Sequence, residues 1–531
     1  MSGPSAPEIP VVAGPPGEAK EGPRPPVYGP RVFRRVYQGF FLLLFVVTLV
    51  LMSDEGIHRF PVRWLFHLDP LAALSVLASS WVLPVAFLWS LALVALTVIF
   101  GRAFCGWLCP VGTIHQIVSW ATRPMRRGAP SKVNRWRPHF RWKYLLLIAL
   151  LALAALGSLQ PGLFDPLSLA LRSFASGLVP AASAAISLEG FRPRIYDWAW
   201  LTGAVFLALL AANAWIARWW CRALCPLGAL LGWVSRTAIY RIEVDPDRCN
   251  HCDRCAADCQ GGDEPFGRHK VSECHVCLNC VSVCPEAAIA YRAFAPAAAP
   301  AGGVDLPRRK ILGAAFTGIA LLPLFRASGG SVSSPAPGAI RPPGALAEAE
   351  FLARCLRCGA CGNACPTGAI QPSVGDTGIE GLWTPVVVPR RGWCEPSCVL
   401  CGQVCPSGAI RPLTPDEKGW TRPEGYGVRI GTAFLDRGRC LPWGMDTPCI
   451  VCQEVCPTVP KAIRLEEAVV TLRDGKQVRL QRPIVDPVRC VGCGLCEAKC
   501  PVTDLAAIRV TRAGESRSPE SAFLLVSREG V

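Results

Sequence analysis

Apolar stretches dominate the first 220 residues of the chain, and the few charged residues within them stand at their ends. Four of these stretches run near residues 36–52, 81–100, 143–159 and 197–216. A bilayer whose hydrocarbon core is about 30 Å thick is crossed by about 20 helical residues. The pattern therefore predicts four membrane-spanning helices rather than the buried helices of a soluble core. A weaker apolar stretch at 168–187 indicates an interfacial or re-entrant helix.

The basic residues of this region are distributed unevenly among its loops. The segment 121–143 holds eight Lys or Arg and no acidic residue, whereas the loops 53–80 and 160–196 are nearly balanced in charge. Because cytoplasmic loops carry an excess of Lys and Arg, the N-terminus, 121–143 and the part of the chain just after residue 217 are expected in the cytoplasm. The net charge of +16 thus reflects residues that flank membrane spans, and no nucleic-acid partner is indicated.

The apolar region contains an internal repeat. Asp69-Pro70 recurs as Asp165-Pro166, and the motif Cys-x-x-x-Cys-Pro occurs at Cys105–Pro110 and again at Cys221–Pro226. Two such hairpins in parallel order are expected to pack about a pseudo-two-fold axis along the membrane normal. That packing can bring Cys105, Cys109, Cys221 and Cys225 to one place. Two thiolate pairs can hold a soft metal or a cluster, and the alternative is four buried free thiols.

The other 24 of the 28 cysteines fall into six groups of four. The groups are Cys249, Cys252, Cys255 and Cys259; Cys274, Cys277, Cys280 and Cys284; Cys355, Cys358, Cys361 and Cys365; Cys394, Cys398, Cys401 and Cys405; Cys440, Cys449, Cys452 and Cys456; and Cys490, Cys493, Cys496 and Cys500. Four groups have the spacing C-x2-C-x2-C-x3-C, which is typical of [4Fe–4S] ligands. The groups that begin at Cys394 and Cys440 have a longer first gap. The pattern predicts six [4Fe–4S] clusters, since zinc ribbons need two separated knuckles and disulfides have no reason to repeat this spacing.

In two-cluster ferredoxins the fourth cysteine of each run ligates the partner cluster. For the first two groups this rule assigns Cys284 to the cluster of the first group and Cys259 to that of the second. No C-x-x-C-H motif occurs in the sequence, so a covalently attached c-type haem is not indicated.

A second kind of hydrophobic segment follows the first two cysteine groups. Arg308-Arg309 opens an apolar run to Phe325, and a Gly, Ser and Pro-rich stretch follows. Paired arginine before a short hydrophobic run is the pattern of a twin-arginine export signal. The run is short for a span, so the segment is either cleaved or retained as an anchor, and a chance Arg-Arg before a buried helix is the alternative. If the segment directs export, residues 347–531 lie outside the inner membrane.

These patterns predict an α-helical membrane bundle of four to five spans with an internal repeat, joined to bacterial-ferredoxin-like α+β [4Fe–4S] domains. We divide the chain into a disordered cytoplasmic tail (1–30), a four-span membrane domain (31–240), a cytoplasmic two-cluster ferredoxin domain (241–293), a linker with the twin-arginine segment at 308–325 (294–346), and an extracytoplasmic four-cluster ferredoxin domain (347–531). The expected location is the bacterial inner membrane.

The ordered motifs resemble two known families in succession. Residues 31–292, with four spans, two C-x-x-x-C-P motifs and a two-cluster tail, resemble the NapH/MauN membrane polyferredoxins, which are related to NosR. Residues 308–510, with a twin-arginine leader and four cluster motifs, resemble the exported NapG/MauM ferredoxins. The resemblance implies a fusion that acts as a quinol dehydrogenase, an oxidoreductase passing electrons from the quinone pool to a periplasmic reductase, such as a nitrate-reductase-like system, or to a small electron carrier.

The resemblance also implies how the last four cysteine groups share ligands. The outer groups are expected to pair, so that Cys500 serves the cluster of Cys355, Cys358 and Cys361, while Cys365 serves that of Cys490, Cys493 and Cys496. Cys405 and Cys456 are then expected to cross between the inner groups.

No catalytic motif beyond the cysteines is evident. Asp69, Asp165, His67 and His115 lie close to the predicted spans and are candidates for accepting protons from quinol, because ionisable groups at membrane depth are often functional. For the two aspartates, capping of a helix that begins at the following proline is an equal alternative. Two other functions remain open: a metal-handling factor that assembles a respiratory or copper enzyme, and an anchor for an exported enzyme.

Overall fold

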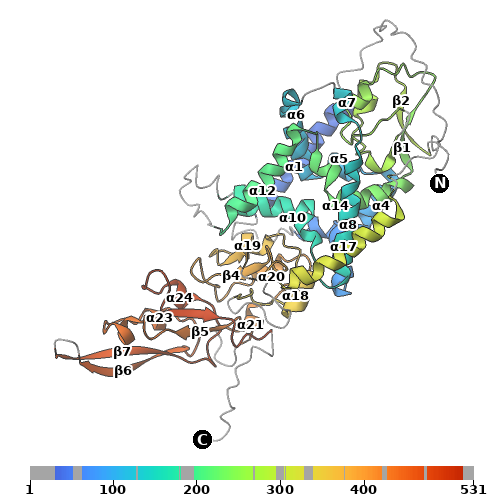
Figure 1. Cartoon of the computed structure of the whole chain (residues 1–531). Coiled ribbons are helices and arrows are strands. Elements are labelled where there is room, and N and C mark those ends of the chain that lie inside the picture. The colour runs from blue at the N-terminus through green and yellow to red at the C-terminus, as the bar shows by residue number, and fades with distance from the viewer. Residues whose placement is uncertain are drawn as a thin grey trace.

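The computed structural model describes residues 30–51, 63–126, 130–178, 180, 196–266, 269–294, 304, 306–327, 339–375, 377–420, 427–471 and 475–517. The predicted tail 1–30 falls almost wholly outside these ranges. A helical region occupies the middle of the molecule, the sheet of β1 (Tyr240–Val244) and β2 (Ile289–Ala293) lies at one end, and β3 (Ile370–Pro372) to β8 (Ile508–Thr511) lie at the other (Figure 1). Cysteine-rich parts of the chain therefore cover both ends of the helical region.

The helices of the middle region are mostly shorter than a membrane span. They are α1 (Pro30–Leu51), α2 (Arg63–His67), α3 (Pro70–Ser80), α4 (Ser90–Phe100), α5 (Ala103–Trp107), α6 (Pro110–Ala121), α7 (Pro130–Asn134), α8 (Trp142–Ala155), α9 (Pro161–Phe164), α10 (Pro166–Ser173), α12 (Ala199–Ala211), α13 (Trp219–Ala223) and α14 (Pro226–Val234).

Within the described residues, two helical stretches are long and apolar enough to cross a membrane, Arg31–Leu49 and Ser131–Ala155. The second and fourth predicted spans form the shorter apolar helices Val85–Phe100 and Ala199–Ala214. The span expected from residue 81 starts later, because Trp81 has a left-handed backbone and Pro84 precedes the first helical turn at Val85. A bundle of four to five spans is therefore not established by helix length. Residues 168–178 of the stretch predicted at 168–187 lie in α10 and in a short π-helical turn, Phe174–Leu178, and residues 181–187 lie outside the described ranges.

The internal repeat is visible in how equivalent helices begin. Asp69 and Asp165 are the N-caps of α3 and α10, and Cys109 and Cys225 are the N-caps of α6 and α14. In all four cases the capping side chain accepts a hydrogen bond from a backbone N–H of the first turn and a proline occupies one of the first helical positions. A carboxylate is a strong N-cap and proline fits the first turn, so each half of the repeat is built by the same local rule.

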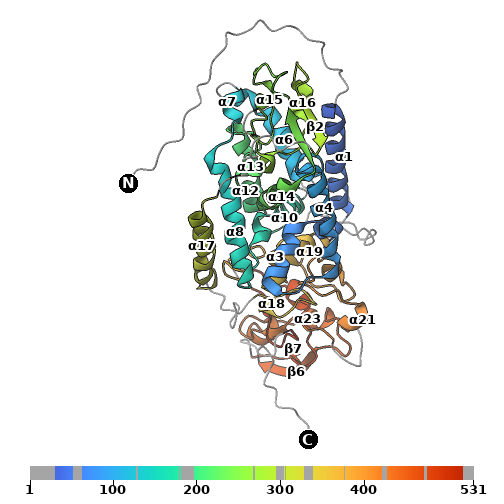
Figure 2. The same cartoon turned by 90° about the vertical axis from the view of Figure 1, so that its right-hand side faces the viewer.

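The twin-arginine segment forms α17 (Arg308–Ala327), which packs along α8 on the outside of the helical region (Figure 2). The contact is close at Gly318, where an added Cβ would lie 2.4 Å from the carbonyl oxygen of Ala149. At the end of the helix, Arg326 donates a hydrogen bond to Leu156 O, with a length of 3.1 Å. The glycine thus permits a backbone approach that any larger residue would prevent.

Six short helices share one relation to the cysteine groups. They are α15 (Arg254–Ala257), α16 (Asn279–Val283), α19 (Ala360–Ala364), α20 (Leu400–Gln403), α23 (Val451–Glu454) and α24 (Leu495–Ala498). Each contains the third cysteine of its group, in the regular and the irregular groups alike. The irregular spacing of two groups therefore affects only their first cysteine, Cys394 or Cys440.

The chain pairs with itself around each two consecutive cysteine groups, which defines three ferredoxin units. β1 pairs antiparallel with β2 around the first unit (249–284), and β5 (Thr432–Leu435) pairs with β8 around the third unit (440–500). An antiparallel bridge between Ala345 and Ile410 closes the second unit (355–405).

The remaining described elements lie within or next to the second and third units. They are α18 (Glu348–Arg354), β4 (Pro385–Val387), α21 (Pro415–Lys418), α22 (Leu441–Gly444), β6 (Ile463–Thr471) and β7 (Gln477–Val485). β3 pairs with β4, and β6 and β7 form a long hairpin inserted between the two cysteine groups of the third unit.

Candidate cluster and thiol centres

In the first unit, a cysteine of one group lies among the cysteines of the other. Burial raises the pKa of Cys280 well above its ordinary value, and the nearby thiols of Cys277, Cys274 and Cys259 raise it further. Near the other end of the unit, Asn250 donates a hydrogen bond of 3.1 Å to Glu286, two residues after Cys284. Cys259 therefore accompanies the second group, in the exchange that the spacing predicts.

In the second unit, the same exchange joins the two consecutive groups. Burial raises the pKa of Cys358 to about 12 and that of Cys361 well above its ordinary value, and Cys405 raises both further. A small cavity is lined by three cysteines of the first group together with Cys405. Cys365 lies in turn beside the second group, since its charge raises the pKa values of Cys398 and Cys401, which burial has already raised.

The third unit repeats this arrangement. A cavity is lined by Cys490, Cys493, Cys496 and the incoming Cys456. Burial raises the pKa of Cys440 to about 11, with further contributions from Cys449 and Cys500. Three cysteines of one run plus one remote cysteine are the donor set of a [4Fe–4S] cluster, so the residues present fit that group.

The ligand sharing implied by the family resemblance is therefore wrong. Cys365 lies beside the Cys394 group rather than the Cys490 group, and Cys500 lies beside Cys440 rather than the Cys355 group. The reason is topological: chain pairing on both sides of each unit closes it around two consecutive groups. A fourth cysteine then reaches only its neighbouring group in the sequence.

The first unit is fixed to one end of the helical region. Trp107 donates a hydrogen bond of 2.8 Å to Val276 O, and Arg102 donates one of 2.7 Å to Ser272 O. Lys143 and Glu273, both fully buried, form an ion pair. The Cys274 group therefore lies directly against the motif that contains Cys105.

The second unit is fixed to the opposite end. Tyr196 donates a hydrogen bond of 3.1 Å to Gly362 O, and Asp197 forms an ion pair of 2.6 Å with Arg391. His67 Nε2 lies 3.2 Å from Pro406 O. The backbone of Gly162, at the start of α9, approaches Leu356 so closely that an added Cβ would lie 2.2 Å from its carbonyl oxygen.

The two Cys-x-x-x-Cys-Pro motifs meet inside the helical region. Cys109 lies within electrostatic range of Cys105 and Cys221, and Cys225 within range of the three other thiols. Cys109 and Cys225 each accept a hydrogen bond from the glycine three residues ahead, with N–S distances of 3.4 and 3.2 Å. We call Cys105, Cys109, Cys221 and Cys225 the thiol quartet.

Two buried arginines cross between the halves of the repeat. Arg102 precedes Cys105 by three residues, and its guanidinium lies 3.0 Å from the Cβ position of Gly228 in the other motif. Arg218 precedes Cys221 by three residues, and it donates a hydrogen bond of 3.0 Å to Cys105 O. A cation near a thiol favours the thiolate, the form that binds metals. The sequence signal for these two arginines is their equivalent position in the two repeats, RAFC and RWWC, three residues before the first cysteine of each motif.

Four thiols from two segments are a donor set for a soft metal ion or for a cluster. Among the described residues, no group of three His, Cys, Asp or Glu is arranged around one metal ion, and this holds for the six cysteine groups as well as for the quartet. The two alternatives for the quartet are therefore still a metal centre and four buried thiols that pack the helices.

Replacing Cys105 or Cys221 with Ala is expected to remove a metal centre if the quartet holds one. Iron and acid-labile sulfide per chain, measured with the visible absorbance, should then fall below those of the parent protein while the six cysteine groups are intact. Ala223→Gly, which alters the buried position between Cys221 and Cys225, is the control and should retain the full content. Unchanged iron and turnover in both cysteine variants would instead identify four packed thiols.

The four proton-acceptor candidates occupy different environments. Asp69 and Asp165 are buried, at 0% and 2% exposure, and lie next to each other as helix caps. His115 is also buried, and its Nδ1 contacts the side-chain amide of Asn213 at 2.8 Å. Burial lowers the pKa of His67. The structure brings the two aspartates together, whereas the side chains of His67 and His115 contact Pro406 and Asn213.

Comparison with known proteins supports the cluster assignment. The 4Fe-4S binding domain family matches residues 82–130 and again 196–242, and a second family with the same description matches 352–371. The first two ranges each contain one Cys-x-x-x-Cys-Pro motif, so the repeat is also recognised at the family level. No solved structure matches.

Curated relatives match different portions of the chain. The ferredoxin-type protein MauM of Paracoccus denitrificans is 37% identical over 174 residues, which are 32% of this chain and 70% of that protein. The chain belongs to the MauM family of ferredoxin-type proteins. The regulatory protein NosR of Pseudomonas aeruginosa is 31% identical over 47% of this chain and 31% of its own length. The putative electron transport protein YccM of Escherichia coli is 30% identical over 40% of this chain and 55% of its own length. The chain thus spans less than two thirds of NosR and of YccM.

This MauM-family chain is therefore an iron–sulfur electron-transfer protein with ferredoxin-type 4Fe-4S domains. The predicted resemblance to MauM and NosR is confirmed, whereas no similarity to NapH in particular is found among these relatives.

Proposed function

We propose that the protein is a membrane-bound quinol dehydrogenase that passes electrons from the quinone pool to a periplasmic reductase or small electron carrier. The observation that carries the proposal is the placement of cysteine centres. The Cys274 group lies against one end of the helical region, beside the Cys-x-x-x-Cys-Pro motif that contains Cys105, and the Cys355 group lies against the other end. Iron–sulfur clusters, when bound, supply one-electron chemistry over a wide range of potentials.

The chain's own side chains fix this order of centres. Lys143 and Glu273, an ion pair buried from water, hold the first unit at one end. Arg172 holds the second unit at the other, where it donates a hydrogen bond of 3.4 Å to Arg357 O. Removal of one partner from a buried ion pair is strongly destabilising, by about 3–5 kcal/mol. These contacts therefore favour rigid docking at both ends.

The proposal includes a topology. We assign the four apolar segments to membrane spans, with α17 retained as a fifth, which accounts for its close packing on α8 at Gly318. The first unit is then cytoplasmic and the second and third units are periplasmic. The basic segment 121–143, which lies on the same side as the first unit, supports this orientation.

Anaerobic mixing of the detergent-purified protein with a reduced quinol analogue tests the function. Rapid bleaching of the visible iron–sulfur absorbance, blocked by a quinone-site inhibitor, is the expected result. If quinol leaves the absorbance unchanged while dithionite bleaches it, the clusters are intact but quinol is not the donor. The quinol dehydrogenase proposal would then be wrong.

A further inference from the structure

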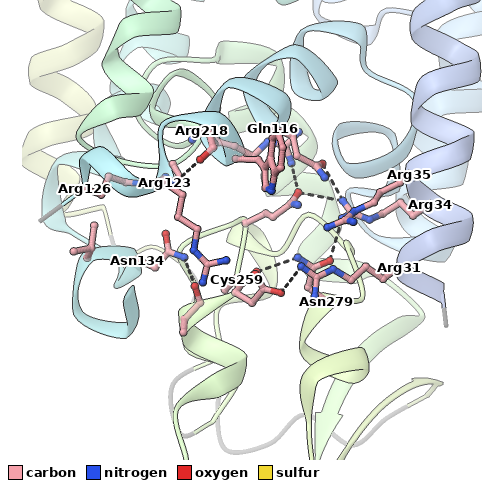
Figure 3. A pocket seen from close by; sticks show the side chains of 17 residues that line it. Arg31, Arg34, Arg35, Gln116, Arg123, Arg126, Asn134, Arg218, Cys259 and Asn279 are labelled. Carbon is pink, nitrogen blue, oxygen red and sulfur yellow. Dashed lines mark hydrogen bonds and ion pairs between the residues drawn. The ribbon is translucent and has the colours of Figure 1, made fainter. Parts of the chain in front are cut away.

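An arginine-rich pocket lies where the helical region meets the first ferredoxin unit (Figure 3). Its cavity of about 140 Å³ is lined by residues from the start of α1, from α6 and the turn after it, from α7, and from the loop around Cys259. A cavity needs only about 10–15 Å³ of such volume to hold one water, so this one has room for a polyatomic group. The cluster ligand Cys259 and the quartet neighbour Arg218 lie at its edge, whereas its remaining arginines have no role in the centres described above.

The lining carries a strong excess of positive charge. It contains six arginines and one aspartate: Arg31, Arg34, Arg35, Arg123, Arg126, Arg218 and Asp258. The aspartate is already engaged, in an ion pair of 3.1 Å with Arg31. Like charges gathered in a partly enclosed site repel one another, so the lining of the pocket favours an anionic ligand over a neutral or cationic one.

The deepest two arginines are held in place by neutral amides. Arg34, which is fully buried, donates to Gln116 and Gln260 at 3.1 Å and to Asn279 at 3.0 Å. Arg218 also donates to Gln260, at 2.9 Å. Amide partners position a guanidinium without neutralising it. The floor of the pocket is therefore rigid and remains positive.

The arginines at the rim have no such partners. Within the described part of the chain, the side chains of Arg35 and Arg123 make no hydrogen bond or ion pair, and both residues are exposed. Figure 3 shows them converging on the cavity from opposite sides, one from α1 and the other from the turn after α6. Unpaired guanidinium forks above a positive floor are suited to an oxyanion, which they bind through paired N–H donors.

Only some of these arginines face the negatively charged cysteine ligands of the neighbouring cluster. Arg222, which is outside the lining, donates to Cys259 O at 2.9 Å and faces that ligand directly. Arg34 lies within electrostatic range of Cys277. Arg35, Arg123 and Arg126 have no comparable cysteine neighbour among the described residues, so a cluster does not explain the rim.

We propose that this pocket binds a phosphate-bearing anion. The phosphate group has the charge and the planar-fork acceptor geometry that arginine recognises, and basic sites near the cytoplasmic ends of spans bind lipid headgroups. Two sources share this chemistry, the headgroup of an anionic phospholipid and free phosphate. The headgroup source rests on the proposed membrane function, since it requires α1 to enter the bilayer, whereas binding of free phosphate does not.

The test compares a rim double variant, Arg35→Gln with Arg123→Gln, with Arg137→Gln, an exposed arginine outside the lining. Titration calorimetry with inorganic phosphate is performed on the delipidated full chain. We expect the parent and Arg137→Gln to bind phosphate saturably, and the double variant to bind it at least tenfold more weakly. Unchanged visible cluster absorbance verifies that the double variant is folded.

Native mass spectrometry distinguishes the two sources. The protein is reconstituted with phosphatidylglycerol and then released into mild detergent. Retained lipid on the parent and on Arg137→Gln, lost from the double variant, identifies a headgroup site, whereas phosphate binding without retained lipid identifies a site for free phosphate. The proposal is overturned if the parent binds neither probe, or if the double variant and Arg137→Gln bind both equally well. Failure of quinol bleaching leaves the phosphate titration unaffected, so the two proposals can fail separately.

Discussion

A Cys365→Ala/Cys394→Ala double variant is expected to lose no more iron than Cys365→Ala alone, because both cysteines serve one cluster. Each single change should cost about four iron atoms per chain, the content of one [4Fe–4S] centre. The Cys365→Ala/Cys490→Ala variant, in contrast, should lose about twice as much, since its cysteines belong to different units. Iron and sulfide analysis, with electron paramagnetic resonance of the reduced protein, measures the loss.

The outer-with-outer sharing of ligands implied by the family resemblance gives the opposite result. In that arrangement Cys365 and Cys490 would serve one cluster. The Cys365→Ala/Cys490→Ala variant would then lose no more iron than either single variant. Thr367→Ala is the matched control, because its Oγ1 lies 3.6 Å from the Cys365 sulfur and its loss removes no ligand. Full iron content in Thr367→Ala would separate the loss of a thiol from local damage.

The sequence was informative wherever function depends on local spacing. The six cysteine groups could be recognised because three ligands of a cluster come from one short segment, and the structure places the third cysteine of every group in the same kind of short helix. The Asp-Pro and Cys-Pro repeats were equally readable, since a capping side chain and the proline after it act within one turn.

Ligand sharing could not be read in this way, because the fourth cysteine comes from a distant position. Its assignment depends on which chain segments pair around a unit, and the pairing of Ala345 with Ile410 involves a single bridge without a strand pattern. The length of the second predicted span was overestimated for a different reason. Hydropathy continues through residues 81–84, but backbone conformation at Trp81 and Pro84 delays the helix.

The arginines that cross between the repeats were also missed. Arg102 and Arg218 stand among many basic residues near the ends of predicted spans, where positive charge is expected for topology alone. Only the tertiary fold distinguishes them, because each is 1% exposed and directed toward the other motif. Burial therefore separates a structural cation from one that orients the protein in a membrane.

The Asp69→Asn variant is expected to be more stable than the parent at alkaline pH and similar to it at acidic pH. Asp69 Oδ1 accepts a hydrogen bond from Leu71 N at 2.8 Å, and Asp165 Oδ2 accepts one from Ser168 N at 2.7 Å. The second oxygen of each carboxyl group, Asp69 Oδ2 and Asp165 Oδ1, is buried without a hydrogen-bond partner among the described residues, and the two carboxyl groups are close enough for Asp165 to raise the pKa of Asp69. Two carboxyl groups can form a hydrogen bond with each other only if one is protonated.

The sign of the pH dependence follows from the pKa shifts. Burial raises the pKa of Asp69 well above its ordinary value, the charge of Asp165 raises it further, and burial likewise raises the pKa of Asp165. The folded state therefore holds a proton that the unfolded chain releases above its ordinary carboxyl pKa. The stability contributed by the shared proton is complete below that ordinary pKa and is lost as the pH rises through the folded-state pKa.

An asparagine at position 69 keeps the cap and donates its amide N–H to Asp165 at any pH, so it removes most of this dependence. A hydrogen bond to one buried carboxyl oxygen that otherwise lacks a partner stabilises the folded state by about 1–3 kcal/mol. The thermal unfolding midpoint of Asp69→Asn should therefore exceed that of the parent by an amount that grows with pH. Asp69→Leu is the contrasting variant: it loses the cap and should be destabilised by about 1 kcal/mol or more at every pH. If the unfolding midpoints of the parent and of Asp69→Asn depend on pH in the same way, the two aspartates do not share a proton.

Loss of quinol-driven bleaching in Asp69→Asn, with stability retained, would instead assign the pair to proton uptake, because asparagine preserves the cap but cannot accept the proton.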